Sequence, residues 1–189
     1  MTDPVHVLGF AGSLRKGSYN RATLHTALQL LPDGMTLEIF DLSPIPLFNA
    51  DVEALGDPEP VRQFKERIAE ADALLIATPE YNYSIPGVLK NAIDWASRPV
   101  TSSPLNGKPV AIMGAGGIFG TVRAQQHLRL IAVHNDMRVL NKPQVHIIRP
   151  WEKFDADGRL TDETIRERIR DLLEALGTWT RQLRFDSKT

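Results

Sequence analysis

The sequence contains no cysteine. This absence excludes disulfides, thiolate nucleophiles, CxxC redox pairs, cysteine-ligated zinc and cysteinyl iron–sulfur clusters. If the protein carries out a redox reaction, a bound cofactor must therefore carry the electrons. The net charge is also small, because 22 Lys and Arg residues nearly balance 23 Asp and Glu residues and leave a formal net charge of -1. A nucleic acid or an anionic membrane is accordingly disfavoured as a partner.

Long hydrophobic runs are missing too. The longest uncharged segment around the apolar stretches, residues 109–122, has 14 residues with four glycines, whereas a membrane-spanning helix needs about 20 residues. The first ten residues show no basic segment followed by an apolar stretch and a small-residue cleavage site, so secretion is not expected. We expect a cytoplasmic protein that does not associate with membranes.

The chain is long enough to form one well-packed domain. It has 189 residues, of which 42% are hydrophobic, and a domain of this size buries most of the surface that its unfolded chain exposes. No internal repeat, low-complexity tract or linker divides the sequence. We expect residues 1–183 to form a single domain and residues 184–189 to be a frayed tail.

Apolar runs of strand length alternate with segments of helical period along the chain. Strands are expected at residues 5–11, 35–40, 73–77, 110–113 and 144–148. Helices are expected at residues 20–31, 61–71, 86–96, 120–134 and 161–183. The proline-punctuated stretch 43–60 is expected to be a long surface connection. This alternation predicts an α/β fold with a five-stranded, doubly wound parallel sheet of strand order 2-1-3-4-5.

The loop after the first strand, residues 12–20, has the residue types of a phosphate site. Its small residues let backbone N–H groups approach an anion, Ser13, Ser18 and Asn20 add side-chain donors, and Arg15 adds a positive charge. The loop is not a Walker A motif, because Ser18 and Tyr19 stand where that motif needs Lys followed by Ser or Thr. The alternative is a serine-rich turn that only caps the following helix.

The loop after the third strand has the residue types of a site for a planar ring. It consists of Pro79, Glu80, Tyr81, Asn82, Tyr83 and Ser84. The two tyrosines offer flat apolar faces, while the asparagine and the glutamate offer polar groups for the edge of a ring. The alternative is a plain turn in which Ser84 caps the next helix, and such a cap would also hold the loop in place.

The loop after the fourth strand, residues 114–120, is rich in glycine. A GxGxxG dinucleotide motif would need glycine at position 119, where Phe119 stands, and the acidic residue expected about twenty positions on has only Asp136 to offer. The spacing therefore does not support a Rossmann-type site. Gly116 and Gly117 still let a ligand approach the backbone closely, and the alternative is a simple tight turn.

These three loops are expected to converge on one crevice. They follow strands 1, 3 and 4, which are neighbours in the predicted strand order, and open α/β sheets bind ligands outside the carboxyl ends of such strands. A phosphate loop, a ring loop and a glycine loop together suit a phosphorylated ribityl ring system such as FMN.

A resemblance to a known family agrees with this interpretation. Residues 78–95, TPEYNYSIPGVLKNAIDW, together with GSLR at 12–15 and SYN at 18–20, resemble the NADPH-dependent FMN reductase family of the flavodoxin-like superfamily. The resemblance implies a flavodoxin-like fold, FMN as cofactor, and NADPH or NADH as hydride donor. It implies that the FMN phosphate is held at Ser13, Arg15, Ser18, Tyr19 and Asn20, and that the ring lies against residues 79–84 with Gly116 and Gly117 nearby.

The resemblance also implies a reaction type and an assembly. Members of this family reduce quinones, azo compounds, flavins or the metal oxyanion chromate, often as homodimers or homotetramers packed through the helix after the second loop. Hydride would pass through FMN to the acceptor in a ping-pong cycle, so no catalytic side chain is required. Tyr81 or Tyr83 is expected to shape the acceptor pocket, and the loop at residues 44–57 to overhang it. No motif identifies the acceptor.

Other readings have less support. The five histidines show no HExxH motif or carboxylate-spaced cluster, so no metal site is expected. Trp95, Trp151 and Trp179 are better explained as core or interface residues than as cofactor stackers. The main alternative function is a flavin-binding electron carrier or redox sensor that does not turn over nicotinamide, although such carriers tend to be strongly acidic. A nucleotide-binding module without flavin is the second alternative.

Overall fold

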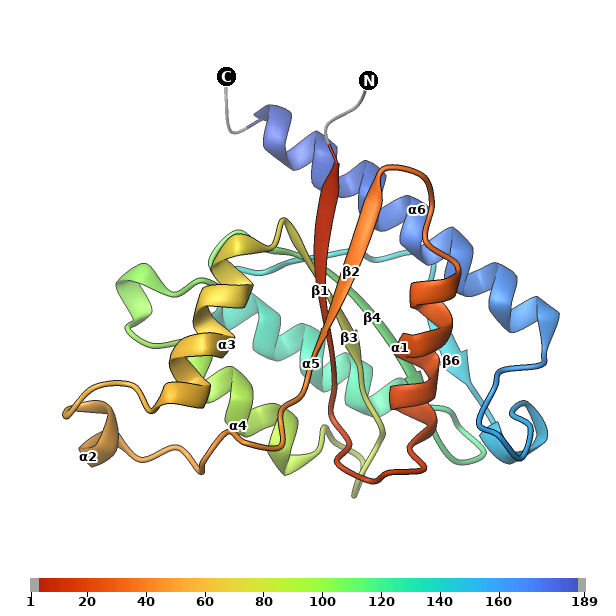
Figure 1. Cartoon of the computed structure of the whole chain (residues 1–189), viewed down its shortest axis with the longest axis horizontal. Helices are drawn as coiled ribbons and strands as arrows, with labels where there is room; N and C mark the ends of the chain where they lie inside the picture. The colour runs from red at the N-terminus through yellow and green to blue at the C-terminus, as the bar shows by residue number, and fades with distance from the viewer. Residues whose placement is uncertain (1–3, 187–189) are drawn as a thin grey trace.

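The computed structural model describes residues 4–186, and its six strands form one parallel sheet (Figure 1). The strands are β1 (Val5–Ala11), β2 (Met35–Phe40), β3 (Ala73–Ala77), β4 (Pro109–Ala115), β5 (Arg138–Val139) and β6 (Val145–Ile147). Their order is β2-β1-β3-β4-β5, and β6 also pairs with β4. The predicted strand order and the predicted α/β fold class are therefore confirmed.

Two of the three central strands, β1 and β3, end at the same level of the sheet, and β4 continues two residues further. Ala11, the last residue of β1, is paired with Ala77, the last residue of β3, and Ala77 is paired in turn with Met113 of β4. All five residues of β3 and all seven of β4 are buried, because helices cover both faces of the sheet and each face must then be apolar. The loops that follow these strands consequently start side by side.

The fifth position of the sheet differs from the single strand expected at residues 144–148. β5 pairs with the beginning of β4 at Pro109 and Val110, whereas β6 pairs with its end from Met113 onward. Pro143 lies between the two short strands, and a proline has no N–H group to give to a strand ladder. The expected strand corresponds to β6, and β5 has no counterpart in the sequence prediction.

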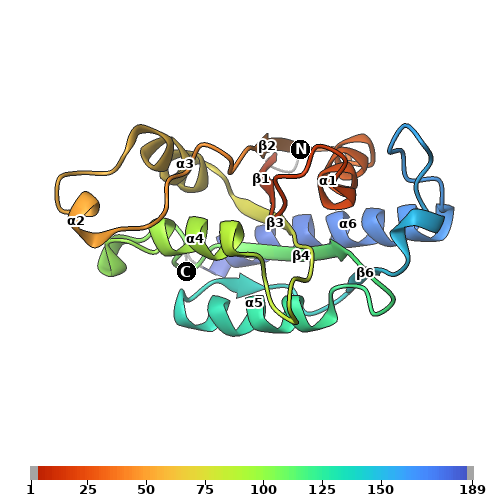
Figure 2. The ribbon, with the colours of Figure 1, turned by 90° about the horizontal axis from the view of Figure 1, so that it is seen from below.

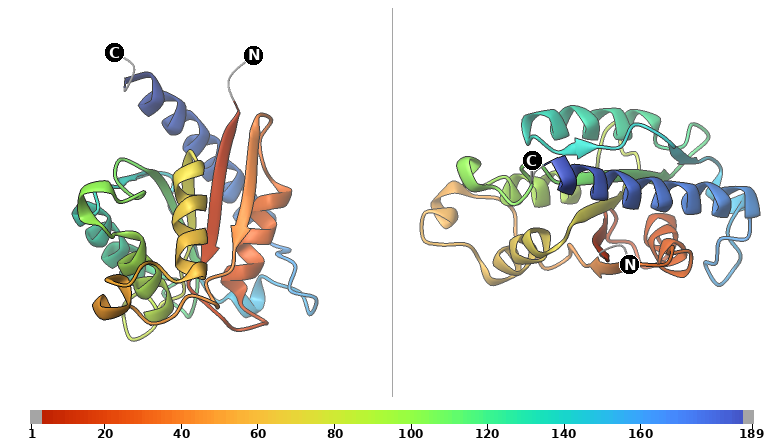
Figure 3. Two further views of the ribbon diagram at one scale, coloured as in Figure 1. Left: turned by 60° about the vertical axis from the view of Figure 1, so that its left-hand side comes forward. Right: turned by 90° about the horizontal axis from the view of Figure 1, so that it is seen from above.

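Two layers of helices enclose the sheet. The helices are α1 (Tyr19–Gln29), α2 (Ala50–Glu53), α3 (Glu59–Glu70), α4 (Gly87–Ala96), α5 (Val122–His134) and α6 (Glu163–Asp186), with short 3₁₀ turns at Val100–Ser102 and Pro150–Glu152. One core joins the sheet to α1 and α6, and the other joins it to α3, α4 and α5. Figure 2 and Figure 3 show this layered arrangement from further directions.

The segment at residues 43–60 lies against α4. The carbonyl oxygen of Pro46 accepts hydrogen bonds from the Asn91 side-chain amide at 2.8 Å and from the Trp95 indole at 2.9 Å. Trp95 itself is completely buried. The one-turn helix α2 interrupts this segment, where no helix was expected, and Asn49 caps it by accepting the Asp51 N–H at 2.9 Å.

The end of the chain is more regular than expected. α6 continues through residues 184–186, which the sequence assigned to a frayed tail, and residues 187–189 lie outside the described residues. Among residues 4–186, none of the helices combines the length and apolarity that a membrane crossing requires.

Candidate active site

A crevice of about 260 Å³ lies where the loops after β1, β3 and β4 meet, at the lower edge of the sheet in Figure 1. Ten of the predicted site residues line it, namely Ser13, Arg15, Ser18, Tyr19, Asn20, Pro79, Glu80, Tyr81, Gly116 and Gly117. Asn82, Tyr83 and Ser84 do not line it. Ala115, Pro150 and Trp151 line it although sequence reasoning did not propose them. The three loops thus converge as expected.

The first loop presents unpaired donors. Within residues 4–186, the backbone N–H groups of residues 13–17 donate to no protein acceptor. The Arg15 guanidinium forms no ion pair with a described residue and lies 5.7 Å from the centre of the Tyr19 ring. Unpaired N–H groups beside a positive charge, at the N-terminus of α1, form a concave site for an anion such as a phosphate.

Ser18 and Asn20 hold this loop in position. The Ser18 hydroxyl accepts the N–H of Arg21 at 3.4 Å and so caps α1. The Asn20 side chain donates to the Ala115 carbonyl oxygen at 2.9 Å and accepts the Ala115 N–H at 2.9 Å. Asn20 therefore ties the first loop to the third, and one N–H of its amide is left for a ligand.

The second loop is fixed through Glu80. The Glu80 carboxylate accepts the backbone N–H groups of Arg123 at 2.9 Å and Ala124 at 3.2 Å, in the first turn of α5. It also pairs with the Arg123 guanidinium at 3.2 Å, and its side chain is only 11% exposed. A carboxylate at this helix end complements the positive pole of the helix. Glu80 therefore positions the loop, while Pro79 and Tyr81 face the crevice.

The rest of the second loop turns away from the crevice. Asn82 and Tyr83 both have positive φ angles, 50° and 64°, and Tyr81 and Ser84 exchange two backbone hydrogen bonds of 3.0 Å around them. Such a two-residue turn reverses the chain tightly. Ser84 does not cap α4, and its hydroxyl is hydrogen bonded instead to Nδ1 of His127 at 2.9 Å.

Tyr83 belongs to a cluster at the rim of the site. The Arg123 guanidinium lies 4.1 Å from the centre of the Tyr83 ring and 5.1 Å from that of Phe119. Because Arg123 also pairs with Glu80, this cluster joins the second loop, the third loop and α5. Tyr83 is therefore placed to support the rim rather than to line the crevice.

The glycine loop requires glycine at its first position. A Cβ atom at Gly114 would lie 2.1 Å from the Thr121 hydroxyl and 2.4 Å from the Thr78 carbonyl oxygen. Gly117 has a φ angle of +43°, which L-residues rarely adopt, and a Cβ there would meet no atom within 4 Å. The loop therefore brings bare backbone to the crevice at Gly116 and Gly117.

Two backbone hydrogen bonds bring a further segment to the site. Ile147 accepts the N–H of Gly116 at 3.1 Å, and Gly117 accepts the N–H of Arg149 at 2.7 Å. Arg149 has a φ angle of 44°, which turns the chain so that Pro150 and Trp151 reach the crevice. Trp151 is 53% exposed, so of the two roles expected for it, core or interface, the core role is wrong. No motif in the sequence marked this segment.

The site combines an anion cradle with exposed ring faces. Ser13 and Arg15 of the cradle line the crevice, and Tyr81 and Trp151 offer half-exposed rings in the same crevice. A ligand with a phosphate and a flat ring system fits this donor set, so the residues present suit FMN. None of the residues at 44–57 lines the crevice, and the overhang expected for that loop is not observed.

Comparisons with known proteins agree with this geometry. The family model described as NADPH-dependent FMN reductase matches residues 5–152. An NAD(P)H-dependent FMN reductase of Pseudomonas aeruginosa is 57% identical over 185 residues, which cover 97% of this chain and 100% of that protein. An NAD(P)H:quinone oxidoreductase of Solanum tuberosum is 48% identical over 178 residues, with 91% of each chain covered.

A solved structure is similar over nearly the whole chain. It is the flavoenzyme NAD(P)H:(acceptor) oxidoreductase of Paracoccus denitrificans, which superposes with a TM-score of 0.86 at 34% identity. The superposition covers 94% of this chain and 98% of that protein.

Proposed function

This chain belongs to the NADPH-dependent FMN reductase family, and from that membership we propose that residues 1–183 act as one domain that holds FMN in the crevice and delivers hydride to a quinone. The chain is an FMN-dependent oxidoreductase that uses NAD(P)H as its reductant. The observation that carries the assignment of the site is the run of unpaired N–H groups at residues 13–17 beside Arg15.

The first loop would hold the phosphate. The N–H groups of residues 13–17 have no protein acceptor, Ser13 and Arg15 line the crevice, and the Arg15 guanidinium would add charge-assisted hydrogen bonds, which are stronger than neutral ones. Asn20 keeps this cradle at a fixed distance from the glycine loop. The ribityl chain would then run past Gly116 and Gly117, which have no side chains of their own.

The ring would lie between the second and third loops. Pro79 and Tyr81 line one side of this part of the crevice, and Trp151 lines it from the segment after β6. When bound, FMN supplies the two-electron chemistry, in which hydride from NAD(P)H in one half-reaction reaches the acceptor in the next. The protein's part is to position the rings and to exclude water, and no side-chain acid or base is needed.

A quinone is the acceptor that this site suits best. A quinone is a flat ring, and the exposed faces of Tyr81 and Trp151 provide stacking surfaces at the mouth of the crevice. The Solanum tuberosum relative is named a quinone oxidoreductase, which supports the same class of acceptor. The nicotinamide and the quinone would use the same stacking position in turn, and this gives the ping-pong order.

A homodimer in the cytoplasm completes the proposal. Leu130 and Val133 on the outer side of α5 are 72% and 76% exposed, and α5 covers the same face of the sheet as α4. Exposed apolar side chains of this kind are typical of subunit contacts. The cytoplasm is proposed because NAD(P)H is supplied there. Light scattering should give twice the monomer mass, and a Leu130→Arg variant should halve it.

One experiment tests the reaction. The purified protein should be yellow or should take up added FMN, NADPH or NADH should bleach it without oxygen, and a quinone should restore the colour. A protein that takes up no FMN would contradict the proposed site. A yellow protein that neither nucleotide bleaches would instead favour the electron carrier or sensor.

A variant tests the phosphate cradle. Arg15→Ala should weaken FMN binding about tenfold, because one charge-assisted contact to phosphate is lost. The quenching of flavin fluorescence on binding measures this affinity. Arg168→Ala is the matched control, since Arg168 is an exposed arginine of α6 that does not line the crevice. Equal affinities in all three proteins would remove Arg15 from the site.

A further inference from the structure

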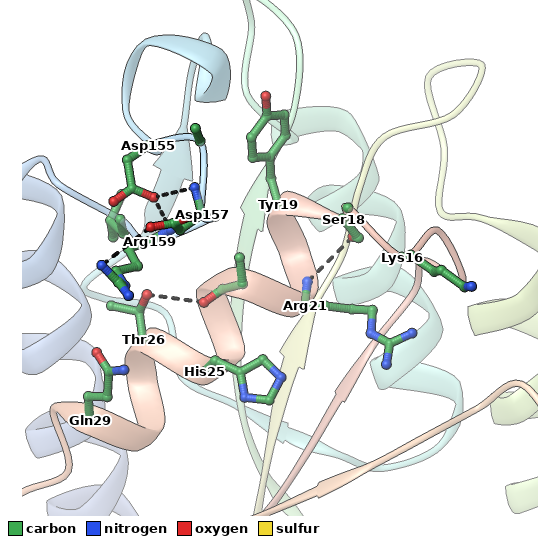
Figure 4. A pocket seen from close by; sticks show the side chains of 15 residues that line it. Lys16, Ser18, Tyr19, Arg21, His25, Thr26, Gln29, Asp155, Asp157 and Arg159 are labelled. Carbon is green, nitrogen blue, oxygen red and sulfur yellow. Dashed lines mark hydrogen bonds and ion pairs between the residues drawn. The ribbon is translucent and has the colours of Figure 1, made fainter.

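The charged side chains around a large concavity beside α1, about 680 Å³ in volume, face different directions. Figure 4 shows Lys16, Arg21 and His25 on the flank of α1 that is turned away from Asp155 and Asp157. Asp155 is engaged within its own loop, where it accepts the N–H of Asp157 at 3.0 Å. Charge does not converge there, unlike in a smaller concavity at the edge of the sheet opposite the crevice.

The smaller concavity has a volume of about 320 Å³ and lies where the strands begin, at the upper edge of the sheet in Figure 1. It is bounded by residues 69–72, which join α3 to β3, by residues 106–109, which lead into β4, and by the last turns of α6. The crevice lies past the other ends of these strands, so the proposed function does not use this concavity. We call it the Lys108 pocket, because Lys108 is one of the residues that line it.

Lys108 is held in this pocket without an ion pair. It is half-buried, and its Nζ donates to the Ala71 carbonyl oxygen at 2.6 Å. Among residues 4–186, no carboxylate pairs with it. Withdrawal from water disfavours the charged form of an amine. Burial, opposed only in part by the charge of Asp72, accordingly lowers the pKa of Lys108 below its ordinary value of 10.5.

Asp72, the acidic residue next to Ala71, is engaged by other groups. Its carboxylate accepts the N–H of His6 at 2.8 Å and pairs with the Arg184 guanidinium. Arg184 also lines the pocket, and it therefore places a second positive charge near Lys108. A neighbouring cation favours the neutral form of a lysine.

The other charged groups around Lys108 are paired with one another. Glu70, which lines the pocket, pairs with Arg67 at 2.8 Å. On the side of β5, the Lys108 carbonyl oxygen accepts the N–H of Arg138, whose guanidinium pairs with Asp136 at 3.3 Å. Lys108 therefore lines the pocket with one side-chain hydrogen bond and no counterion among the described residues.

The other described lysines differ from Lys108 in this respect. Three of them pair with carboxylates, namely Lys65 with Asp57, Lys90 with Asp94 and Lys153 with Asp162. Lys16 and Lys142 are exposed, so water stabilises their charge. At neutral pH, Lys108 therefore has the largest fraction of neutral amine, which is the form that attacks electrophiles.

We propose that Lys108 is a site of acylation by small acyl phosphates. The neutral Nζ attacks the acyl carbon, the bond from that carbon to the phosphate oxygen breaks, phosphate leaves with the electron pair, and a proton of the amine passes to water. The pocket has room for an acetyl group, and Arg184 favours an anionic donor. The product is a neutral amide whose N–H can still donate to Ala71.

Competition between two lysines of the same protein tests this proposal. The purified protein is treated with a limiting amount of acetyl phosphate at pH 7, cleaved with a protease that does not cut at lysine, and analysed by mass spectrometry. Lys108 should be acetylated about fivefold faster than the exposed Lys142, because the rate follows the fraction of neutral amine. The ratio should shrink as the pH approaches about 10, where exposed lysines also lose their protons.

A pair of variants tests the role of the missing counterion. Asn106→Asp adds a carboxylate to the lining of the pocket and should slow the acetylation of Lys108 about fivefold, because an anion stabilises the ammonium form. Asn141→Asp is the matched control, since Asn141 is exposed and does not line the pocket, and the rate at Lys108 should stay as in the wild type.

Three results would overturn the proposal. These are acetylation of Lys108 no faster than that of Lys142 at pH 7, equal rates at Lys108 in Asn106→Asp and the wild type, and the same slowing in Asn141→Asp. None of them bears on the proposed function, because the Lys108 pocket and the crevice share no lining residue.

Discussion

Asn20 and Ala115 exchange two hydrogen bonds of 2.9 Å, one in each direction, between a side-chain amide at the start of α1 and the backbone at the end of β4. The two residues are 95 positions apart, and both are buried. Backbone groups that lose their partners in such a place carry the full cost of desolvation. This one side chain therefore sets the distance between the phosphate cradle and the glycine loop.

Replacement of Asn20 should damage both stability and the site. We expect Asn20→Ala to lower the free energy of unfolding by about 2–3 kcal/mol, because the N–H and the carbonyl of Ala115 are left unsatisfied. Urea unfolding measures the loss, and FMN binding should weaken in parallel. Asn106→Ala is the control, since Asn106 is exposed and its side chain makes a single hydrogen bond of 3.3 Å. Equal stability of the two variants would contradict this role of Asn20.

Substitution of Gly114 and of Gly87 by alanine compares a crowded glycine with an uncrowded one. Gly114→Ala should destabilise the protein by about 3 kcal/mol, because its Cβ would overlap Thr121 and Thr78, and overpacking against backbone is not relieved by side-chain movement. Gly87→Ala, at the start of α4, meets no atom within 4 Å and should change stability by less than about 1 kcal/mol. Thermal unfolding distinguishes them, and a tolerated Gly114→Ala would show that the third loop can move.

Trp151 should affect the acceptor more than the fold. Its half-exposed ring contributes little to the core, so Trp151→Ala should raise the KM for a quinone about fivefold to tenfold, a loss of ~1 kcal/mol of stacking. Trp151→Phe should keep most of the affinity. Binding of FMN should quench less indole fluorescence in both variants than in the wild type. An unchanged KM together with unchanged quenching would place Trp151 outside the site.

His146 should make stability depend on pH. Burial, and secondarily the charge of Arg129, lower its pKa below the ordinary value of 6.5, and its buried Nδ1 has no partner among the described residues. The folded protein then binds a proton less readily than the unfolded chain. Stability is therefore fully present above about pH 6.5 and falls as the pH drops below this value.

A substitution isolates this effect. Urea midpoints measured between pH 7.5 and pH 5.5 should decline less in His146→Gln than in the wild type. The exposed residue His134 provides the control variant, His134→Gln, whose decline should match that of the wild type. Parallel curves for all three proteins would refute the assignment to His146.

Much of this fold follows from local sequence patterns. β1, β2 and β3 have the predicted bounds, because each is an uninterrupted apolar or alternating run between turn signals. β5 was missed because two residues make no pattern, and its pairing with β4 depends on tertiary contacts. α2 was missed because it is a helix of a single turn, stabilised by its Asn49 cap, in a segment that prolines interrupt, and so short a helix shows no period in the sequence.

The site was predictable to the level of its loops. The crevice is lined, as expected, by Pro79 to Tyr81, by Gly116 and Gly117, and by five residues of the first loop, namely Ser13, Arg15, Ser18, Tyr19 and Asn20. The positive φ angle of Tyr83, which turns residues 82–84 away, is uncommon for a bulky side chain and leaves no signature in the sequence. Trp151 reaches the crevice through the left-handed Arg149 and its hydrogen bond to Gly117, and both depend on the folded third loop.

The bonds of Asn20, Glu80 and Arg149 join the three loops to one another through protein atoms alone. A site assembled in this way keeps its shape when the ligand leaves, so little ordering is required when a ligand returns. We therefore expect that FMN can be removed without unfolding the protein and that the apoprotein can bind a flavin again. The apoprotein could then be reconstituted with synthetic flavins that keep the phosphate but differ in ring electronics. The properties of each bound flavin would report on its surroundings in the crevice.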